Sequence, residues 1–274
     1  MLTEERRSEL ATLLENEQRL NAEYPKVAEY LDMAPQLPGT GDEGADAAFD
    51  LRLVHYLIGG NVDTTNPYWD IVSPAVSEHD GRRFVDGGRK AGSARLAYAQ
   101  MLLQAVYAYA IPSPETVEWV STFCGGRPLI EHGAGRGYWA MQLAQAGLRV
   151  EAYDSEPPDQ TENVSFPRAA GQRDVWYPVE GLGSPAECMA DRADHVLFLC
   201  WPPGWGNPMA SDALAAFEKA GGSRLILIGQ RRGGMNATDE FFDSLSIGWE
   251  LASEDSKFVS WWNLSDIAQG WVRR

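Results

Sequence analysis

The sequence predicts an α/β protein in which a helical N-terminal extension precedes a doubly wound, mostly parallel sheet. The first observation behind this is that apolar residues recur at helical spacing through the first third of the chain. The second is that, from about residue 113, short apolar runs alternate with helical segments, as in a parallel sheet whose strands are joined by helices. We therefore divide the chain into a helical extension over residues 1–112 and an α/β domain over residues 113–274.

Size and charge narrow the class of protein. The chain has 274 residues, 44% of them hydrophobic and 23% charged, which is typical of one large globular domain with an accessory part. A net charge of -16 repels polyanions and anionic lipid, so we expect neither nucleic acid nor a membrane as a partner. The charged start lacks the apolar core of a secretory signal, which favours a cytoplasmic protein. Three isolated cysteines, Cys124, Cys188 and Cys200, predict buried thiols and no metal site.

Helices are expected through the first third of the chain, with interruptions. Leucines from Leu10 to Leu20 recur at helical spacing, and another helical turn follows Pro25. Residues 35–50 mix Pro, Gly and acidic residues, which predicts a linker or surface loop. The short basic stretch 82–95 is rich in glycine and is expected to be a solvated loop.

Capping signals mark two helices around the boundary between the two parts. Ser93 is a candidate N-cap for a helix through Ala110, which Pro112 ends. Ser113 then precedes a proline at the first helical position, and the second helix is expected to end near Gly125.

Strands and helices alternate through the rest of the chain. The expected strands are 128–131, 148–154, 196–201 and 224–229, and the expected helices are 138–147 and 210–222. Two further strand candidates, 249–254 and 267–274, have no convincing helix between them, which predicts a closing antiparallel hairpin. The pattern as a whole predicts a Rossmann-like domain.

A glycine-rich turn follows the first of these strands, with Glu131, Gly133, Gly135 and Gly137 at alternate positions. Glycines at such a turn allow the backbone to bend sharply and a ligand to approach the main chain. A dinucleotide-binding fingerprint starting at Gly133 would need glycine at position 138, which is Tyr138. The spacing therefore argues against a nicotinamide-dependent oxidoreductase.

The turn resembles motif I of the class I S-adenosylmethionine-dependent methyltransferases, E-x-G-x-G-x-G. The resemblance covers about residues 113–274 and implies the sheet of that class, with S-adenosylmethionine as cofactor. It implies that the three glycines wrap the methionine part of the cofactor and that Glu131 interacts with its ammonium end, directly or through water. Asp154 ends the next strand, seventeen residues after Gly137, and would accept both ribose hydroxyls. A simple cap at the strand end is the alternative for Asp154.

The segment after the strand at 196–201 resembles the [DN]-P-P-[YFW] turn of amino-directed methyltransferases. Both prolines are present, but Trp201 replaces the polar residue and Gly204 replaces the aromatic one. Methylation of an adenine or a glutamine amide by the usual geometry is therefore disfavoured. We still expect Trp201 and Pro202 to border the cofactor, because ligands bind at the carboxyl ends of strands in such folds.

Aromatic and basic residues near the same edge are candidates for binding the methyl acceptor. They are Tyr107, Tyr109, Trp205, Arg231, Trp261 and Trp262. Tryptophans in expected loops favour an apolar pocket for a flat acceptor, and packing against the N-terminal helices is the alternative for Trp261 and Trp262. Arg231 would hold an acceptor carboxylate, or else be solvated.

Together these features predict an enzyme that uses S-adenosylmethionine to methylate an O or N atom of a small molecule or modified peptide. The methyl group would move by direct displacement, with proximity and exclusion of water as the main contributions. His55 and His132 are nominal bases, and no catalytic base is assigned. The alternative is a non-catalytic partner or regulatory subunit that keeps the methyltransferase fold.

Overall fold

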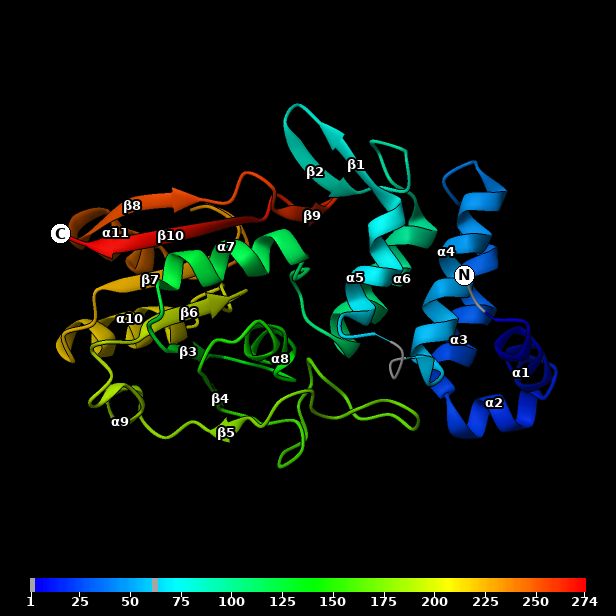
Figure 1. The fold of residues 1–274 in the computed structure, drawn as a ribbon, viewed down its shortest axis with the longest axis horizontal. Helices are drawn as coiled ribbons and strands as arrows, with labels where there is room; N and C mark the ends of the chain where they lie inside the picture. The colour runs from blue at the N-terminus through cyan, green and yellow to red at the C-terminus, as the bar shows by residue number, and fades with distance from the viewer. Residues whose placement is uncertain (1–2, 61–63) are drawn as a thin grey trace.

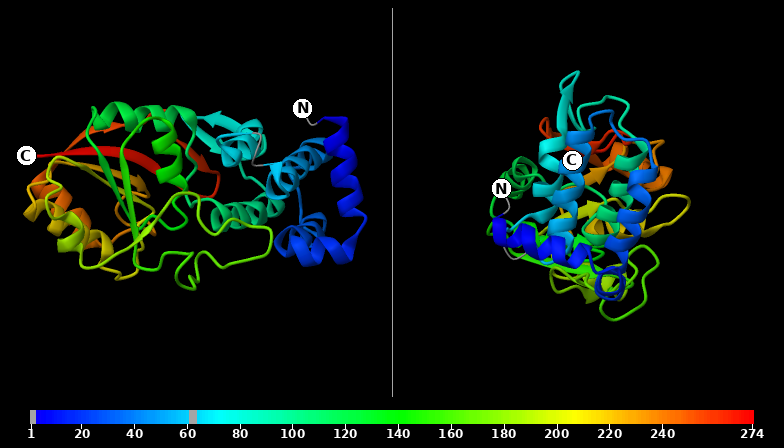
Figure 2. Two further views of the ribbon diagram at one scale, coloured as in Figure 1. Left: turned by 60° about the horizontal axis from the view of Figure 1, so that its bottom comes forward. Right: turned by 90° about the vertical axis from the view of Figure 1, so that its right-hand side faces the viewer.

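A computed structural model describes residues 3–60 and 64–274 of the chain. The N-terminal helices lie at one end of an elongated molecule and the large sheet lies at the other (Figures 1 and 2). The N-terminal part contains α1 (Glu4–Leu14), α2 (Glu17–Glu23), α3 (Pro25–Met33), α4 (Glu43–Leu57), α5 (Pro67–Val72) and α6 (Ala94–Val106), with short 3-10 helices η1 (Ala34–Gln36) and η3 (Ser73–Ala75).

A seven-stranded sheet forms the second part, in the order β5-β4-β3-β6-β7-β10-β8. Its strands are β3 (Leu129–His132), β4 (Val150–Asp154), β5 (Glu180–Gly181), β6 (Val196–Cys200), β7 (Arg224–Gly229), β8 (Trp249–Glu254) and β10 (Ile267–Arg273). Only β10 runs antiparallel to its neighbours, β7 and β8. The predicted fold class, a doubly wound and mostly parallel sheet, is therefore confirmed, as is the closing antiparallel hairpin.

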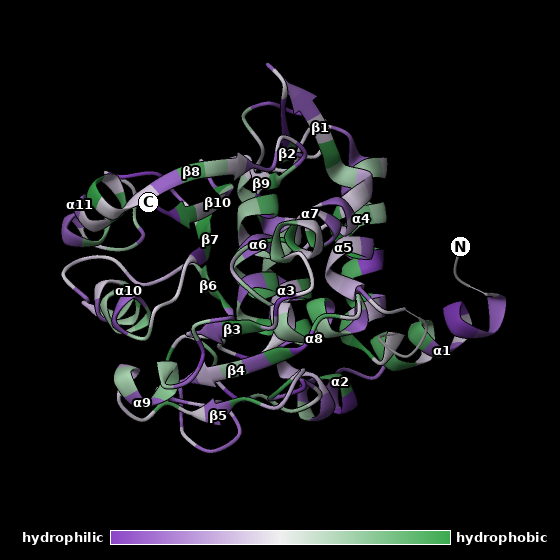
Figure 3. Cartoon of the chain, turned by 60° about the vertical axis from the view of Figure 1, so that its left-hand side comes forward, coloured by the Kyte–Doolittle hydropathy of each residue, from purple (hydrophilic) through white to green (hydrophobic). Residues whose placement is uncertain are grey.

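Helices cover both faces of this sheet because successive strand residues point to opposite sides. Ile130 packs in one cluster with α9 (Pro185–Met189), α10 (Met209–Lys219) and α11 (Asp239–Gly248). Leu129 packs on the other face with α7 (Pro114–Cys124) and α8 (Tyr138–Gln145). Figure 3 shows the hydrophobic character of the central strands β6 and β7, and every residue of β6 except the last is buried.

The strand order places a crevice at one edge of the sheet. After β3 the chain adds β4 and β5 on one side, and then returns to add β6 and β7 on the other side of β3. Ligands in open α/β sheets bind where the strand order reverses, outside the carboxyl ends of the strands. Because β10 is antiparallel, its first residues lie at this same edge, where Ile267 pairs with Gly229.

The prediction of a linker or surface loop over residues 35–50 is wrong in its second half. Helix α4 begins at Glu43, and the Asp42 side chain caps it by accepting a hydrogen bond from the Ala45 amide at 2.9 Å. The helix buries Phe49 and Leu53 in the N-terminal core. Acidic residues that look like loop composition are here a cap and a first helical turn, where they interact favourably with the helix dipole.

The prediction of a solvated loop over residues 82–95 is wrong at its two ends, since residues 82–85 form a strand and a helix begins at Ala94. Strands β1 (Val76–His79) and β2 (Arg82–Val85) form a hairpin, and β2 pairs in parallel with β9 (Val259–Trp261) from the far end of the chain. Asp86 after β2 is fully buried and accepts hydrogen bonds from Ser77 and Gly88. Residues on both sides of the expected boundary at 112 therefore share one small three-stranded sheet, a pairing with no local signal in the sequence.

Candidate functional site

A cavity of about 670 Å³ lies at the carboxyl edge of the sheet, next to the ends of β3, β4 and β6. Three of its walls come from segments that sequence analysis singled out. These are the glycine turn from Gly133 to Gly135, Asp154 at the end of β4, and the segment from Trp201 to Trp205. Tyr109, which follows α6, and Met209, which begins α10, line it as well.

The glycine turn needs glycine for two different reasons. Gly135 lines the cavity with a φ of 53°, and a Cβ atom there would lie 2.7 Å from the ring of Phe166. Gly137 caps α8 with a φ of 72°, and a Cβ atom would lie 2.8 Å from the Tyr177 carbonyl oxygen. Gly137 does not line the cavity, so it supports the turn through packing, whereas Gly133 and Gly135 expose their backbone to the cavity.

Asp154 connects the glycine turn to the end of β4. Its Oδ2 accepts a hydrogen bond from the Gly135 amide at 2.8 Å, and its Oδ1 accepts one from the Glu156 amide at 2.9 Å. The carboxylate lines the cavity and is only half-buried. A carboxylate has about four lone-pair positions, so each oxygen keeps acceptor capacity toward the cavity.

Glu131 and His132 are buried residues on the cavity wall, and each has side-chain polar atoms without a hydrogen-bond partner. Glu131 is 2% exposed and His132 is 1% exposed. Glu131 Oε2 and both ring nitrogens of His132 have no hydrogen-bond partner among the described residues. Burial raises the pKa of Glu131 well above its usual value and lowers the pKa of His132 to about 4. Orphaned buried groups of this kind indicate that a ligand completes the site.

Aromatic side chains form an aromatic wall of the cavity, and one of them, Phe166, lies against the glycine turn at Gly135. The Trp201 ring stacks on Tyr109 with centroids 5.2 Å apart, and Phe166 meets Tyr109 edge-on. Trp201 has a φ of 52°, and its Nε1 donates a hydrogen bond to Asp266 Oδ2 at 2.9 Å. Asp266 is 2% exposed, and its Oδ1 has no partner among the described residues. The buried Asp266 side chain therefore holds the Trp201 indole in place, although a positive φ is unfavourable for the Trp201 backbone.

Trp205 and Pro202 differ in their position relative to the cavity. Trp205 lines the cavity yet is 86% exposed, so its ring stands on the rim. Pro202 does not line the cavity, although Pro203 does. The Pro202 carbonyl accepts a hydrogen bond from the Ala237 amide at 3.1 Å and so ties this turn to the segment after β7.

Tyr107 lines the inner end of the cavity from within an aromatic cluster. Its ring stacks on Tyr68 with centroids 5.3 Å apart and contacts Trp176 and Tyr138. Burial raises the pKa of its phenol. The Trp176 Nε1 donates to the Val106 carbonyl at 2.9 Å, which fastens this cluster to the end of α6.

The remaining acceptor candidates do not line the cavity. Trp261 is buried in the N-terminal core, and its Nε1 donates to the Tyr68 hydroxyl at 3.0 Å. Trp262 packs over Gly92. Arg231 binds both carboxylate oxygens of Glu254 at 2.8 and 2.9 Å, beside a separate hollow.

Phe166 and Met235 line the cavity but gave no signal in the sequence, and Arg136, which supports the site from outside the lining, gave only one. Phe166 lies in the irregular segment between β4 and β5, Met235 lies after β7, and neither belongs to a periodic pattern. Arg136 lies inside the glycine turn and is 1% exposed. It donates hydrogen bonds to four backbone carbonyls, of Ala105, Pro167, Arg173 and Asp174. Its place between two glycines of the motif was the only available clue.

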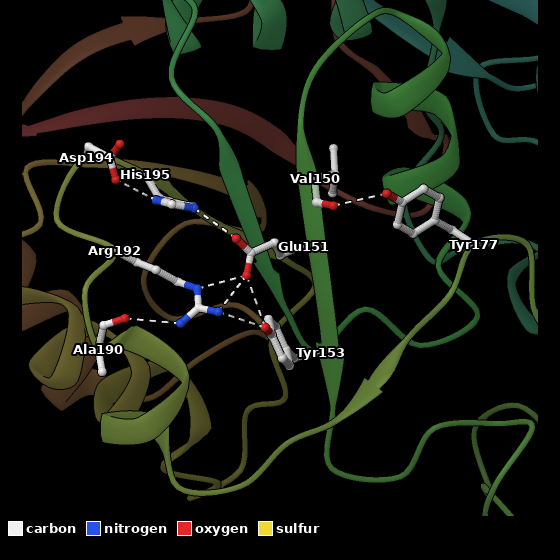
Figure 4. Close-up of polar contacts among 8 residues, drawn as sticks. All are labelled: Val150, Glu151, Tyr153, Tyr177, Ala190, Arg192, Asp194 and His195. Carbon is white, nitrogen blue, oxygen red and sulfur yellow. Dashed lines mark hydrogen bonds and ion pairs between the residues drawn. The ribbon is translucent and has the colours of Figure 1, made fainter.

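Of the four histidines only His132 lines the cavity. His195 lies between Asp194 and Glu151, at 2.8 and 3.1 Å, in a charged network that Arg192 and Tyr153 complete (Figure 4). This network lies beside β4, away from the cavity lining. It ties the segment before β6 to β4 and has a structural role.

Among residues 3–60 and 64–274 no group of His, Cys, Asp or Glu side chains is arranged to hold a metal ion. The three cysteines are free thiols, with Cys124 and Cys188 buried and Cys200 half-buried on the cavity wall. In the same part of the chain no helix is long and apolar enough to cross a membrane.

Comparison with known proteins gives structural likenesses only. No protein-family model matches the chain, and no curated protein matches it. Magnesium protoporphyrin IX methyltransferase (ChlM) from Synechocystis PCC 6803, solved with bound SAM, is 12% identical over 80% of this chain and 94% of its own, with a TM-score of 0.37. Mitomycin 7-O-methyltransferase MmcR is 15% identical over 82% of this chain and 68% of its own, with a TM-score of 0.38. The CcbJ methyltransferase from Streptomyces caelestis is 13% identical over 58% and 88%, with a TM-score of 0.34.

Proposed function

We propose that the protein is an S-adenosylmethionine-dependent methyltransferase that methylates an O or N atom of a small molecule or modified peptide. One observation carries the proposal. Glu131, the Gly133–Gly135 turn and Asp154, which together match motif I and the acid after it, meet on one wall of a 670 Å³ cavity. A cofactor with an ammonium group and a ribose finds complementary groups on that wall.

The residues present fit the cofactor chemically. The unpartnered Glu131 Oε2 would accept from the cofactor ammonium group, and that positive charge would favour the ionised carboxylate that burial otherwise disfavours. The free acceptor capacity of Asp154 would take the ribose hydroxyls. Gly133 and Gly135 would border the methionine part, with Gly137 holding the turn and Trp201 lining the same cavity, whereas Pro202 stays outside the lining.

When bound, the cofactor supplies an electrophilic methyl group on a sulfonium. An acceptor lone pair would take this methyl group, and the electron pair of the broken carbon–sulfur bond would stay on sulfur. An acceptor proton would be lost to solvent when the product leaves. The aromatic wall of Trp201, Tyr109 and Phe166 would exclude water and place the acceptor, which are the main contributions that such a displacement requires.

We further propose that residues 1–112 act as a helical extension that helps to close the site of the 113–274 domain. Tyr107 and Tyr109 belong to the extension and line the cavity with residues of the domain. Removal of the extension would therefore expose the acceptor side of the cavity.

Calorimetric titration of the purified protein with S-adenosylmethionine, S-adenosylhomocysteine and NAD tests the proposal. We expect micromolar binding of the first two compounds and none of NAD. Binding followed by methyl transfer to any acceptor in a panel of aromatic and peptide compounds would establish the enzyme. Binding without turnover of any acceptor would favour a non-catalytic partner or regulatory subunit, and absence of binding would overturn the cofactor assignment.

A further inference from the structure

The charge of the cavity narrows the class of acceptor, an inference that rests on the proposed function. We propose that the acceptor is a flat aromatic compound that carries a positively charged group and no carboxylate or phosphate. The charged group is separate from the atom that receives the methyl group, because the attacking atom needs a free lone pair.

The first observation is that the cavity lining holds acidic side chains and no strong base. Four carboxylates line it, and among the described lining residues none is lysine or arginine. These carboxylates belong to Glu131, Asp154, Glu156 and Asp212. The one histidine, His132, stays neutral at physiological pH because burial lowers its pKa to about 4.

The second observation is that these carboxyl groups have no ion-pair partner within the described part of the protein. None of the four carboxylates has a lysine, arginine or histidine within ion-pair distance in the described part of the chain. By contrast, the arginines near the sheet edge are already paired, Arg231 with Glu254 and Arg232 with Asp239 and Asp243. A cleft lined by charge of one sign concentrates ligands of the opposite sign and repels those of the same sign.

The third observation is the exposure of the four carboxylates. Glu131 and Asp154 belong to the segments where the cofactor is expected, and Glu156 follows Asp154 by two residues. Asp212 lies in the first turn of α10, is exposed and lines the cavity together with Asn207 and Trp205. Asp212 is therefore the exposed carboxylate outside the segments assigned to the cofactor, and it is the one that would meet a cation on the acceptor.

The fourth observation is the aromatic part of the lining. Trp201, Tyr109, Phe166 and Trp205 all line the cavity, with Trp201 stacked on Tyr109 and Trp205 largely exposed. Tryptophan and tyrosine faces attract cations as well as flat rings. An aromatic cation can stack on the rings and also interact favourably with the unpaired carboxylates. An aromatic anion can only stack on the rings.

Three indole compounds with the same ring and different charges test the inference. Tryptamine is a cation at neutral pH, indole-3-propionamide is neutral and indole-3-propionate is an anion. Each is titrated into the full-length protein saturated with S-adenosylhomocysteine, and binding is measured by saturation-transfer NMR. We expect tryptamine to bind at least about tenfold more tightly than indole-3-propionate, with the amide between them.

Two charge-matched variants locate the effect. Asp212→Asn removes the carboxylate assigned to the acceptor, and we expect it to reduce the preference for tryptamine over indole-3-propionate at least about threefold. Glu250→Gln removes the same charge from the exposed edge strand β8, outside the cavity lining, and should leave the preference unchanged.

The outcomes separate this inference from the proposed function. Failure of S-adenosylhomocysteine to bind overturns the proposed function. If S-adenosylhomocysteine binds and tryptamine does not, or indole-3-propionate binds as tightly as tryptamine, the acceptor inference is overturned and the function stands. An unchanged preference in Asp212→Asn overturns the assignment of Asp212 as the recognising group.

Discussion

At the scale of single residues, the site depends on carboxyl groups in three different environments. Glu131 is buried without a partner on one oxygen, Asp154 is half-buried and accepts two backbone amides, and Asp266 is buried beneath Trp201. Only Asp154 has its carboxylate satisfied by amides while facing the cavity. The same functional group, a carboxyl, therefore serves to bind a ligand, to connect two loops or to hold an indole, according to its surroundings.

Asp154→Ala is expected to weaken the binding of S-adenosylmethionine by about 1.5 to 3 kcal/mol, because charge-assisted hydrogen bonds to the ribose are lost. Calorimetric titration measures the effect. Glu250→Ala, which removes the same charge from β8, is the matched control and should retain full affinity. Since Asp154 also accepts the Gly135 amide, the melting temperature of each variant is measured alongside. Unchanged affinity in a folded Asp154→Ala protein would contradict the ribose assignment.

The free energy of unfolding of Asp266→Asn, relative to that of the wild type, is expected to increase as pH rises. Burial raises the pKa of Asp266 from 3.8 to about 6. Between these values the unfolded chain loses its proton while the folded chain keeps it, so the wild-type carboxyl lowers the free energy of unfolding as pH rises. Asparagine removes this titration and keeps an oxygen acceptor for Trp201. The difference in unfolding free energy between variant and wild type should grow by about 2 to 3 kcal/mol from pH 4 to pH 7.

Urea denaturation at several pH values measures that difference. Asp32→Asn, at an exposed aspartate of α3, is the matched control and should show no comparable trend. A difference for Asp266→Asn that stays constant with pH would show that the carboxyl is not perturbed in the folded protein.

At the scale of elements, an irregular connection forms one side of the site. Residues 155–179 join β4 to β5 with no helix or strand, and they contribute Asn163 and Phe166 to the cavity. Arg136 holds this connection, since three of its four carbonyl acceptors belong to it and the fourth is at the end of α6. The Trp176 amide returns a hydrogen bond to the Arg136 carbonyl at 2.7 Å.

Arg136→Met is expected to lower the free energy of unfolding by about 3 kcal/mol or more, because buried carbonyls lose charged donors that a thioether cannot replace. Chemical denaturation gives the free energy, and limited proteolysis followed by mass spectrometry shows whether residues 155–179 become cleavable. Arg149→Met, at an exposed arginine, is the control for loss of charge. Equal stability and equal protease resistance of the two variants would contradict the role of Arg136.

At the scale of the whole molecule, charge and shape act on the same site. The chain carries a net charge of -16, and the cavity lining repeats this sign locally. The N-terminal helices and the sheet lie at opposite ends, with the hairpin β1–β2 beside β9 (Figure 1). Cationic ligands are therefore favoured by the overall field as well as by the cavity.

Salt should weaken the binding of S-adenosylmethionine more than that of S-adenosylhomocysteine. The first has a net positive charge at neutral pH and the second is neutral, so only the first gains from the negative field. Between about 50 and about 300 mM NaCl we expect the Kd of S-adenosylmethionine to rise about threefold, and that of S-adenosylhomocysteine to change less than half as much. Calorimetry over a salt series measures both, and equal slopes would contradict a charge-selective cavity.

The sequence by itself determined the principal strands and helices of the second part and the position of the glycine turn, but not the short elements β5, α9 and β9 or the helix α11. Both depend on local properties: hydrophobic periodicity marks strands and helices, and a turn with φ values such as those of Gly135 and Gly137 favours glycine. The position of Asp154 at the end of a strand could be predicted from the same alternation of strands and helices. The expected loops at 35–50 and 82–95 were wrong in part because composition alone does not show a cap or a distant strand partner.

Only the tertiary structure decided which aromatic residues face the cavity. Tyr109 and Trp201 stack on each other in the cavity lining, whereas Trp261 lies in the N-terminal core through the pairing of β9 with β2. Trp201 and Trp261 belong to the same residue type and both lie near the sheet edge, so no local pattern distinguishes them. Their environments are set by contacts between residues far apart in the chain, because burial is a property of the packed molecule and not of a sequence window.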